Sequence, residues 1–254
     1  MAKSANDTVK STDTAFSILE YVRDDGPAGV TEISEHIGMS KGAVHRYLVT
    51  LSELGYLNKQ SDGYRIGLGF ILFGSVAKDR EYVHQLAEPK VRELAEDTGE
   101  RVQFIAEENG LGVYIHIKSG VNAVHTNTRE GKITHLPTSA AGKSILAFSP
   151  EPWVNDVLDK HGLQRLTSNT ITSRERLFEE LEEIRRRGYA INKEEHIEGL
   201  WGTGVPIRGP DDGVLGAISV SGPTHRVKNQ ILSEGIPNKI LGVVNEIELN
   251  LRYE

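Results

Sequence analysis

The sequence predicts an α+β protein of two domains: a small helical domain that ends in a β-hairpin, then a larger domain of mixed strands and helices. Two observations carry this prediction. Three amphipathic helical segments and two short β-type runs fill residues 12–67, and near residue 101 the spacing of apolar residues changes from helical to alternating. A length of 254 residues is enough for one large or two modest domains, each with its own core.

The composition excludes several classes of site. The chain has no cysteine, which excludes disulfide frameworks, cysteine-ligated zinc, iron–sulfur clusters and thiol nucleophiles. No apolar run approaches the roughly 20 residues of a membrane span, and the polar start lacks the apolar region of a signal peptide. We therefore expect a soluble cytoplasmic protein that does not contact membranes.

Local signals place the first two helices. A polar segment, 1–11, has no apolar periodicity and is expected to be a flexible tail before the first domain, 12–67. Thr12 or Asp13 is placed to cap the first helix, and Thr31 is placed to cap the second. Each helix is followed by a glycine, which is typical of a helix end.

The third predicted helix has one apolar face and one face that is small or basic. It begins after Ser40 as its cap and ends near Leu54. At about 100° per residue, its apolar residues share one face, and the N-terminal part of the other face carries Lys41, Gly42, His45 and Arg46. A helix of this kind can enter the major groove of DNA with its N-terminus first. Two short β-type runs around a tight turn follow it.

Three helices and a hairpin in this order are typical of a winged helix-turn-helix domain, which binds double-stranded DNA. We expect Lys41 and Arg46 to reach phosphates or guanine edges, and Ser40 with the first-turn amides to suit a phosphate. Arg65 on the hairpin is expected to reach the DNA backbone or minor groove. Residues 40–66 carry four basic against two acidic side chains, although the whole chain has a net charge of −7. Taken alone, the third helix also fits an ordinary amphipathic surface helix.

The second half of the chain predicts a domain of mixed strands and helices. Residues 68–80 form an apolar linker helix that is expected to contribute to a dimer contact, and the second domain covers 81–254. Strands are predicted at 102–106, 113–117, 121–126, 188–192, 202–207 and 214–221. Helices are predicted at 82–98, 140–148, 151–160, 173–187 and 227–251. This mixture indicates an α+β domain.

The most informative stretch of this domain is Leu136–Ser144, where a proline and capping residues precede small residues that begin a helix. Small side chains leave the first-turn amides open, and such a helix end attracts carboxylates and phosphates. The stretch ends in Gly142-Lys143-Ser144, like a P-loop, but the glycine that the motif needs five residues earlier is Pro137. Nucleotide hydrolysis is therefore rejected, and an ordinary capped helix with close packing at Ala140 and Ala141 is the structural alternative.

Both halves of the chain resemble the IclR family of transcriptional regulators. In the first half, SKGAVHRYLVTL followed by GYL and YRIG carries the resemblance. In the second, LPTSAAGKSILA, GYAINKEEHIEGLWGTGVPI and GVLGAISVSGP resemble segments of the family's effector-binding domain, which has a GAF-like α/β fold. The resemblance implies a regulator that controls metabolic genes in response to a small organic acid, as a homodimer or homotetramer without a cofactor. Repressor and activator both stay open.

The resemblance also implies a site, because the three segments of the second domain meet around one effector pocket in the family. By position, the implied residues are Ala140 and Ala141 with their backbone amides, Asn192, Leu200 and Gly202 on the wall, and the hydroxyls of Ser219 and Ser221. Asn192 stands where the family usually has an acidic residue, and Gly202 where it often has cysteine. An asparagine donates as well as accepts, so a more anionic effector becomes tolerable. A glycine enlarges the pocket or lets the backbone approach the ligand.

Two other functions stay open. One is a small-molecule-processing enzyme with an appended winged helix, although the sequence shows no recognisable nucleophile–base pair and no nucleophile elbow. The other is a winged-helix module that binds proteins and never contacts DNA. The nine histidines, including His116, His125 and His135 on or near strands, show no metal-ligand spacing, so no metal site is predicted. We predict a transcription regulator and no catalytic residues.

Overall fold

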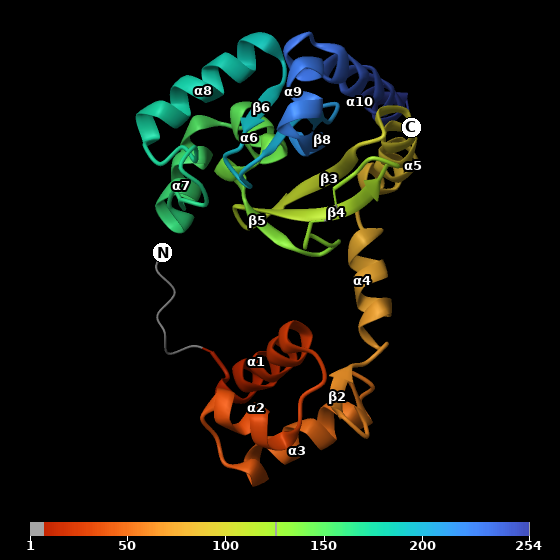
Figure 1. Cartoon of the computed structure of the whole chain (residues 1–254), viewed down its shortest axis with the longest axis vertical. Helices are drawn as coiled ribbons and strands as arrows, with labels where there is room; N and C mark the ends of the chain where they lie inside the picture. The colour runs from red at the N-terminus through yellow and green to blue at the C-terminus, as the bar shows by residue number, and fades with distance from the viewer. Residues whose placement is uncertain (1–7, 125, 254) are drawn as a thin grey trace. The chain divides into compact units, whose positions relative to one another are not determined.

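The computed structural model describes residues 8–124 and 126–253 (Figure 1). They divide into two compact units, one ending at Ala77 and the other beginning at Lys78. Most of the predicted tail and His125 therefore lie outside the described residues. No helix within the described ranges is long and apolar enough to cross a lipid bilayer.

The first unit is a three-helix core with a β-hairpin. Its elements are α1 (Lys10–Asp25), α2 (Val30–Ile37), α3 (Lys41–Glu53), β1 (Leu57–Gln60) and β2 (Gly63–Ile66), followed by α4 (Phe70–Lys78). The two strands are antiparallel, and Ala28 adds a short bridge to Tyr64 of β2. The apolar faces of α1, α2 and α3 meet in one core, where Ile18, Ile33 and Val44 are fully buried. This order is the winged helix-turn-helix fold that the sequence predicts.

The structure corrects the predicted starts of the first two helices. α1 begins earlier than predicted, so Thr12 and Asp13 lie inside its first turn and do not cap it. α2 also begins earlier than Thr31. The carboxylate of Glu32 accepts a hydrogen bond of 2.7 Å from the N–H of Gly29, which precedes the helix. Polar and acidic residues suit the first turn as well as the cap, so the sequence alone did not separate these positions.

The second unit is built on one antiparallel sheet with the strand order β5-β4-β3-β8-β7-β6. The strands are β3 (Arg101–Glu108), β4 (Leu111–Ser119), β5 (Ile133–His135), β6 (Ala190–Lys193), β7 (Leu200–Arg208) and β8 (Val214–Pro223). One face packs on α5 (Tyr82–Thr98), α9 (Thr224–Leu232) and α10 (Gly235–Tyr253). The other face packs on η1 (Leu136–Thr138), α6 (Ala140–Ala147), α7 (Glu151–His161) and α8 (Arg174–Arg187) (Figure 1). The result is the α+β domain that the sequence predicts, with a core on each face of the sheet.

The strand predicted at 121–126 is wrong for the described residues of that segment. Val121 is 96% exposed, and the N–H groups of Asn122 and Ala123 donate to the carbonyls of Gly99 and Gly120, which belong to no strand. The edge of the sheet is formed by β5 instead, which the sequence did not predict. Val121 and Val124 are three positions apart, so the segment lacks the period of two that a half-buried strand requires.

The single helix predicted at 227–251 is also wrong, because the structure has two helices there, α9 and α10. Glu234, between them, has a φ of 61°, which is outside the right-handed helical region. Pro237 then lies in the first turn of α10, where the missing N–H of proline costs no hydrogen bond.

Candidate functional site

A cavity lies on the face of the sheet where α6 begins. Directly opposed residues on antiparallel strands place their side chains on the same face. One row of such residues crosses four strands in the order Arg101, Ser221, Gly202 and Asn192. The adjacent row contains Gln103, Ser219 and Gly204. The cavity volume is about 70 Å³, which exceeds the roughly 10–15 Å³ that a cavity needs to hold a water molecule.

The two rows form the floor of the cavity, and a glycine in β7 allows α6 to begin close to them. A Cβ on Gly204 would lie 2.8 Å from the backbone of Ala140 and of Ala141, so only glycine permits this approach. Ser139 caps α6, and its hydroxyl accepts a hydrogen bond of 3.0 Å from the N–H of Gly142. The first amides of a helix have no partner within it. Ser139 and Ala140 line the cavity, so the positive end of the α6 dipole lies beside it.

The buried side chain of Lys143 connects α6 to neighbouring elements. Its side chain is fully buried, and its Nζ lies 2.7 Å from a carboxylate oxygen of Glu195 and 3.5 Å from one of Glu180. The same Nζ donates a hydrogen bond of 2.8 Å to the carbonyl of Ile191. These contacts connect α6 to α8 and to the loop after β6. The lysine of the P-loop-like stretch is therefore a structural residue, and it holds the wall of the cavity.

Asn192, at the end of β6, and His196, in the loop that follows, line the cavity. The Asn192 amide donates to the carbonyl of Thr138 at 2.7 Å and accepts from the N–H of Glu195 at 3.1 Å. Each of its two polar atoms has one further hydrogen-bonding position for a ligand. Nδ1 of His196 lies 3.3 Å from the Thr138 hydroxyl oxygen. Burial lowers the pKa of the His196 imidazole, so the ring is predominantly neutral at pH 7.

Gln103 organises the hydroxyls on the opposite wall. Its amide nitrogen lies 3.2 Å from the hydroxyl oxygen of Ser219 and 3.2 Å from that of Ser221. Because side chains alternate along a strand, both serines face the cavity with Gln103. Neither Gln103 nor its neighbour Arg101 was singled out from the sequence. Polar residues at alternate positions of a strand in a buried sheet are the signal that points to them.

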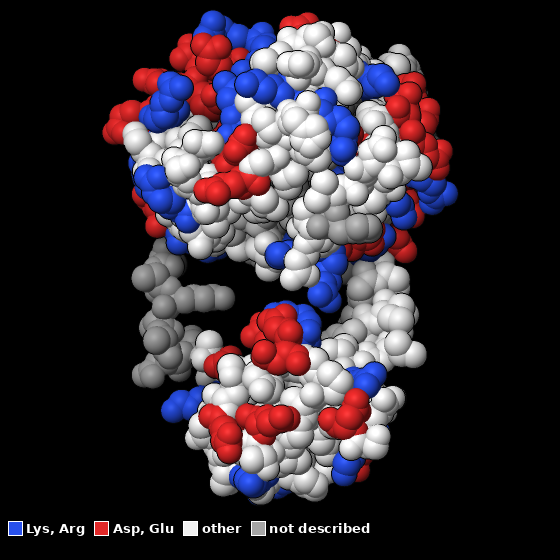
Figure 2. Space-filling view, viewed as in Figure 1, with Lys and Arg blue, Asp and Glu red and all other residues white. Residues whose placement is uncertain are grey.

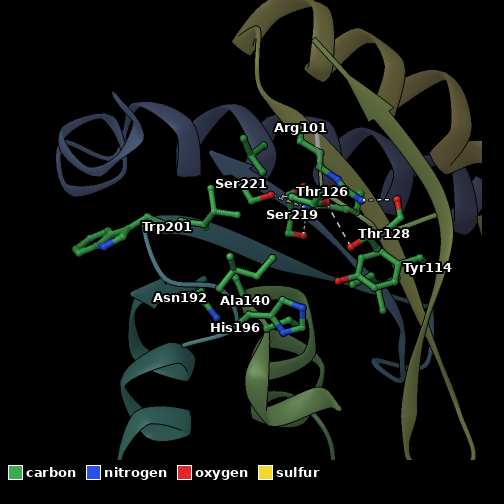
Figure 3. A pocket seen from close by; sticks show the side chains of 17 residues that line it. Arg101, Tyr114, Thr126, Thr128, Ala140, Asn192, His196, Trp201, Ser219 and Ser221 are labelled. Carbon is green, nitrogen blue, oxygen red and sulfur yellow. Dashed lines mark hydrogen bonds between the residues drawn. The ribbon is translucent and has the colours of Figure 1, made fainter. Parts of the chain in front are cut away.

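The cavity contains every residue that the sequence assigned to the effector site except Ala141 (Figure 3). Ala141 is fully buried and packs in the core between α6 and the sheet. Leu200 and Gly202 line the cavity, while Trp201 between them packs mainly on the opposite face of the sheet, with the Nζ of Lys228 5.2 Å from its ring centroid. Figure 3 shows Asn192, Ala140 and His196 on one side of the cavity and Arg101 and Thr126 on the other.

The residues assigned to DNA contact are all exposed on the first unit. They are Ser40, Lys41, Gly42, His45, Arg46 and Arg65. Ser40 caps α3, as predicted, and accepts a hydrogen bond of 3.3 Å from the N–H of Ala43. The apolar face of α3 is buried at the same time. Arg65 in β2 forms an exposed ion pair of 2.6 Å with Asp62 at the turn of the hairpin.

Several other histidines contact backbone or ring atoms within the second unit. His116 is buried, and its Nε2 lies 2.6 Å from the carbonyl oxygen of His84. The ring of His135 lies 6.3 Å from that of His161, measured between centroids. Within the described ranges, no group of three or more His, Asp or Glu side chains is arranged to hold a metal ion.

Comparison with known proteins identifies the family. Residues 11–61 match the IclR helix-turn-helix domain, and residues 76–245 match the family described as bacterial transcriptional regulator IclR C-terminal. The probable HTH-type transcriptional regulator ArcR of Halobacterium salinarum is 30% identical over 248 residues, which cover 96% of this chain and 94% of that protein.

Solved structures agree with this assignment. The crystal structure of the Thermotoga maritima IclR superposes with a TM-score of 0.82 at 32% identity, covering 96% of this chain and 99% of that one. An IclR homologue from Microbacterium hydrocarbonoxydans, complexed with 4-hydroxybenzoate, shares the fold with a TM-score of 0.80 at 22% identity, covering 96% of this chain and 99% of that one. The chain therefore belongs to the IclR family of transcriptional regulators.

Proposed function

We propose that a small organic acid binds the cavity of the second unit and changes the affinity of the winged helix for operator DNA. The observation that carries this proposal is the cavity itself, where the N-terminus of α6, the Asn192 side chain and the serine hydroxyls converge. No aspartate or glutamate is among the described residues that line it, so an anion meets no fixed repulsive charge. The 4-hydroxybenzoate bound by the Microbacterium homologue is itself a small organic acid, which supports this ligand class.

We propose that the N-terminal part of α3, together with the hairpin, forms the DNA-binding surface. Lys41 and Arg46 are exposed beside the capped end of the helix. Two cations and a set of open amides at one helix end suit the phosphates that flank a major groove. Arg65 would have to exchange its exposed partner Asp62 for a phosphate. That exchange is inexpensive because exposed ion pairs contribute little.

We propose that α4 forms a homodimer with a second copy of the chain. Symmetric operators require at least a dimer. Leu68 before α4 and Ile71, Leu72 and Val76 within it are 65% to 80% exposed. Figure 2 shows that the surface of α4 is largely without charged side chains. Clustered apolar side chains of this kind mark an interaction surface, and pairing of two such dimers would give a homotetramer.

We infer that the protein regulates and does not catalyse. The relatives that it matches are named as transcriptional regulators. The hydroxyls of Ser219 and Ser221 contact Gln103, which is not a base, and His196 contacts Thr138. The Thr138 hydroxyl donates its proton to the carbonyl of His135 at 2.8 Å and not to His196. These described residues therefore do not form the nucleophile–base hydrogen bond that is usual in covalent catalysis. These observations favour a binding site over an active site.

The experiment that tests this function measures binding of the full chain to its own upstream DNA across a salt series, with and without a panel of small organic acids. A double variant, Lys41→Ala with Arg46→Ala, should bind more weakly and with a shallower salt dependence. The logarithmic slope should fall by about 0.9 for each phosphate that the variant no longer neutralises. The control, Lys160→Ala with Arg176→Ala, removes the same charge from the exposed surface of the second unit and should leave the slope unchanged. Undiminished DNA binding by the first variant would contradict the assignment of α3.

A further inference from the structure

Arg101, the first residue of β3, is a buried cation without a counter-charge. Its side chain is 6% exposed, and no ion pair joins it to a carboxylate in the described part of the chain. Its Nη2 donates a hydrogen bond of 3.3 Å to the carbonyl of Thr128, and its Nε is buried without a partner. A guanidinium has five N–H donors in a rigid fork. Most of the donor capacity of Arg101 is therefore unused.

An unpaired buried charge is unfavourable, so natural proteins pair or hydrogen-bond buried charges. Two ion pairs of this unit that include a buried charge follow that rule: Lys143 pairs with Glu195, and the buried Glu100, the sequence neighbour of Arg101, pairs with Arg226. Burial lowers the pKa of the Arg101 guanidinium below its ordinary value, yet arginine keeps its charge at neutral pH. No carboxylate in the described part of the chain supplies a counter-charge to Arg101.

The cavity is where that counter-charge can be placed. Arg101 lines the cavity together with Tyr114, Thr126 and Thr128 (Figure 3). In the row across the floor, Arg101 and Asn192 are the two ends, three strands apart, or roughly 14 Å between backbones at the usual strand spacing. The cavity thus has a guanidinium at one end and the N-terminus of α6 with Asn192 at the other.

We propose that Arg101 is the charge-recognition residue of the cavity and that its guanidinium pairs with a carboxylate of the effector. This inference rests on the proposed function for the presence of an acid, and it adds where the charge lies. The planar fork of arginine matches a carboxylate through two parallel hydrogen bonds. Gln103, Ser219 and Ser221 lie beside this end of the row and can bond a keto or hydroxyl oxygen next to the carboxylate.

The groups beside Arg101 narrow the ligand class further. Because Gln103, Ser219 and Ser221 suit an oxygen next to the carboxylate, the proposed class is a 2-keto or 2-hydroxy acid. The cavity volume of about 70 Å³ favours a short acid over a bulky one.

The test compares acids with their matched amides on the full chain by calorimetric titration. The probes are pyruvate, lactate and glycerate, each beside its carboxamide, with inorganic phosphate as a different anion. The wild-type protein should bind at least one acid about tenfold or more tightly than its amide, since a charge-assisted hydrogen bond contributes that much. Arg101→Gln should weaken acid binding by about ten- to a hundredfold and abolish the preference over the amide. Arg101→Lys keeps the positive charge but lacks the planar guanidinium. This variant should retain part of the preference for the acid over the amide.

Two controls separate this result from misfolding and from bulk charge. Arg92→Gln removes an exposed arginine of α5 and should bind acids as the wild type does. The thermal midpoint of Arg101→Gln without acid should equal or exceed that of the wild type, because a buried unpaired charge is removed. The rise in midpoint that acids cause in the wild type should disappear in this variant.

Several outcomes would overturn the inference, and they are distinguishable. If Arg101→Gln binds an acid as well as the wild type and DNA binding still responds to that acid, Arg101 is not the recognition residue, but the proposed function stands. Tighter binding of phosphate than of any acid would overturn the carboxylate assignment. If no acid binds the wild type and none changes its DNA affinity, both the inference and the proposed function fail.

Discussion

Replacement of Lys143 by methionine should destabilise the second unit by about 3–5 kcal/mol, the range observed when one partner of a buried ion pair is removed. Methionine keeps most of the volume of the lysine stem, so the removal of the charge dominates. The Lys143 side chain has no exposed surface and that of Glu195 is 7% exposed, so water cannot replace the missing ammonium. Glu180 retains a second partner, Arg187, at 3.1 Å. The main cost is therefore the carboxylate of Glu195, left buried without a cation.

Urea unfolding followed by tryptophan fluorescence measures this destabilisation. Both tryptophans of the chain, Trp153 and Trp201, lie in the second unit, so the signal reports that unit alone. The control is Lys160→Met, at an exposed lysine whose Nζ donates to a backbone carbonyl. It should change the free energy of unfolding by no more than about 0.5 kcal/mol.

A double variant isolates the charge. Lys143→Met combined with Glu195→Gln should be more stable than Lys143→Met alone, because the buried carboxylate is no longer ionised. A destabilisation below about 1 kcal/mol for Lys143→Met would refute the reasoning, since a buried pair is worth more than an exposed one. A double variant whose destabilisation equals the sum of the two single values would refute it equally, because the two charges would then be energetically independent.

Three further predictions concern α4, β7 and the buried histidines. Leu72→Glu in α4 should weaken self-association by at least about tenfold in analytical ultracentrifugation, since burial of a leucine stabilises by about 1.5–3 kcal/mol; an unchanged dimer would place the interface elsewhere. Gly204→Ala should cost about 1–3 kcal/mol in urea unfolding, because its Cβ would meet the backbone of α6 at 2.8 Å; a neutral effect would contradict the close approach. Burial lowers the pKa of three imidazoles from the ordinary 6.5, those of His84, His116 and His196. Just below the ordinary pKa, the unfolded chain therefore binds more protons than the folded chain. The contribution of these histidines to the free energy of unfolding is at its maximum above that pH. It should fall as the pH drops, by up to about 1.4 kcal/mol per pH unit for each histidine; unfolding that does not depend on pH between about 7 and 5 would contradict this.

The winged helix was predictable because its signals are local. Ser40 before α3, the glycine after α2 and the tight turn of the hairpin each act within a few residues of the chain. The errors in this unit concern helix starts, at Thr12 or Asp13 and at Thr31, where two positions of the first turn accept the same residue types. The sequence therefore determines the type of an element better than it determines the residue at which the element begins.

The cavity was predictable only in part because its geometry depends on strand register. The serines of β8 were found by alternation within one strand. Arg101 and Gln103 become part of the site only when β3 lies beside β8, with Arg101 opposite Ser221. The role of Lys143 likewise depends on Glu195, whose carboxylate is distant in sequence. Pairings of this kind leave no periodic signal in the sequence, so the structure was needed to reveal them.

The measurement that tests the account most directly is the reciprocal coupling between acid and operator DNA. The affinity of the full chain for DNA is measured with and without a saturating acid, and the affinity for the acid is measured with and without saturating DNA. Because both ligands act on one equilibrium, the two ratios must be equal. We predict a common factor of about five or more, in either direction. An acid that binds the cavity with the same affinity in the presence and absence of operator DNA would contradict a ligand-responsive regulator.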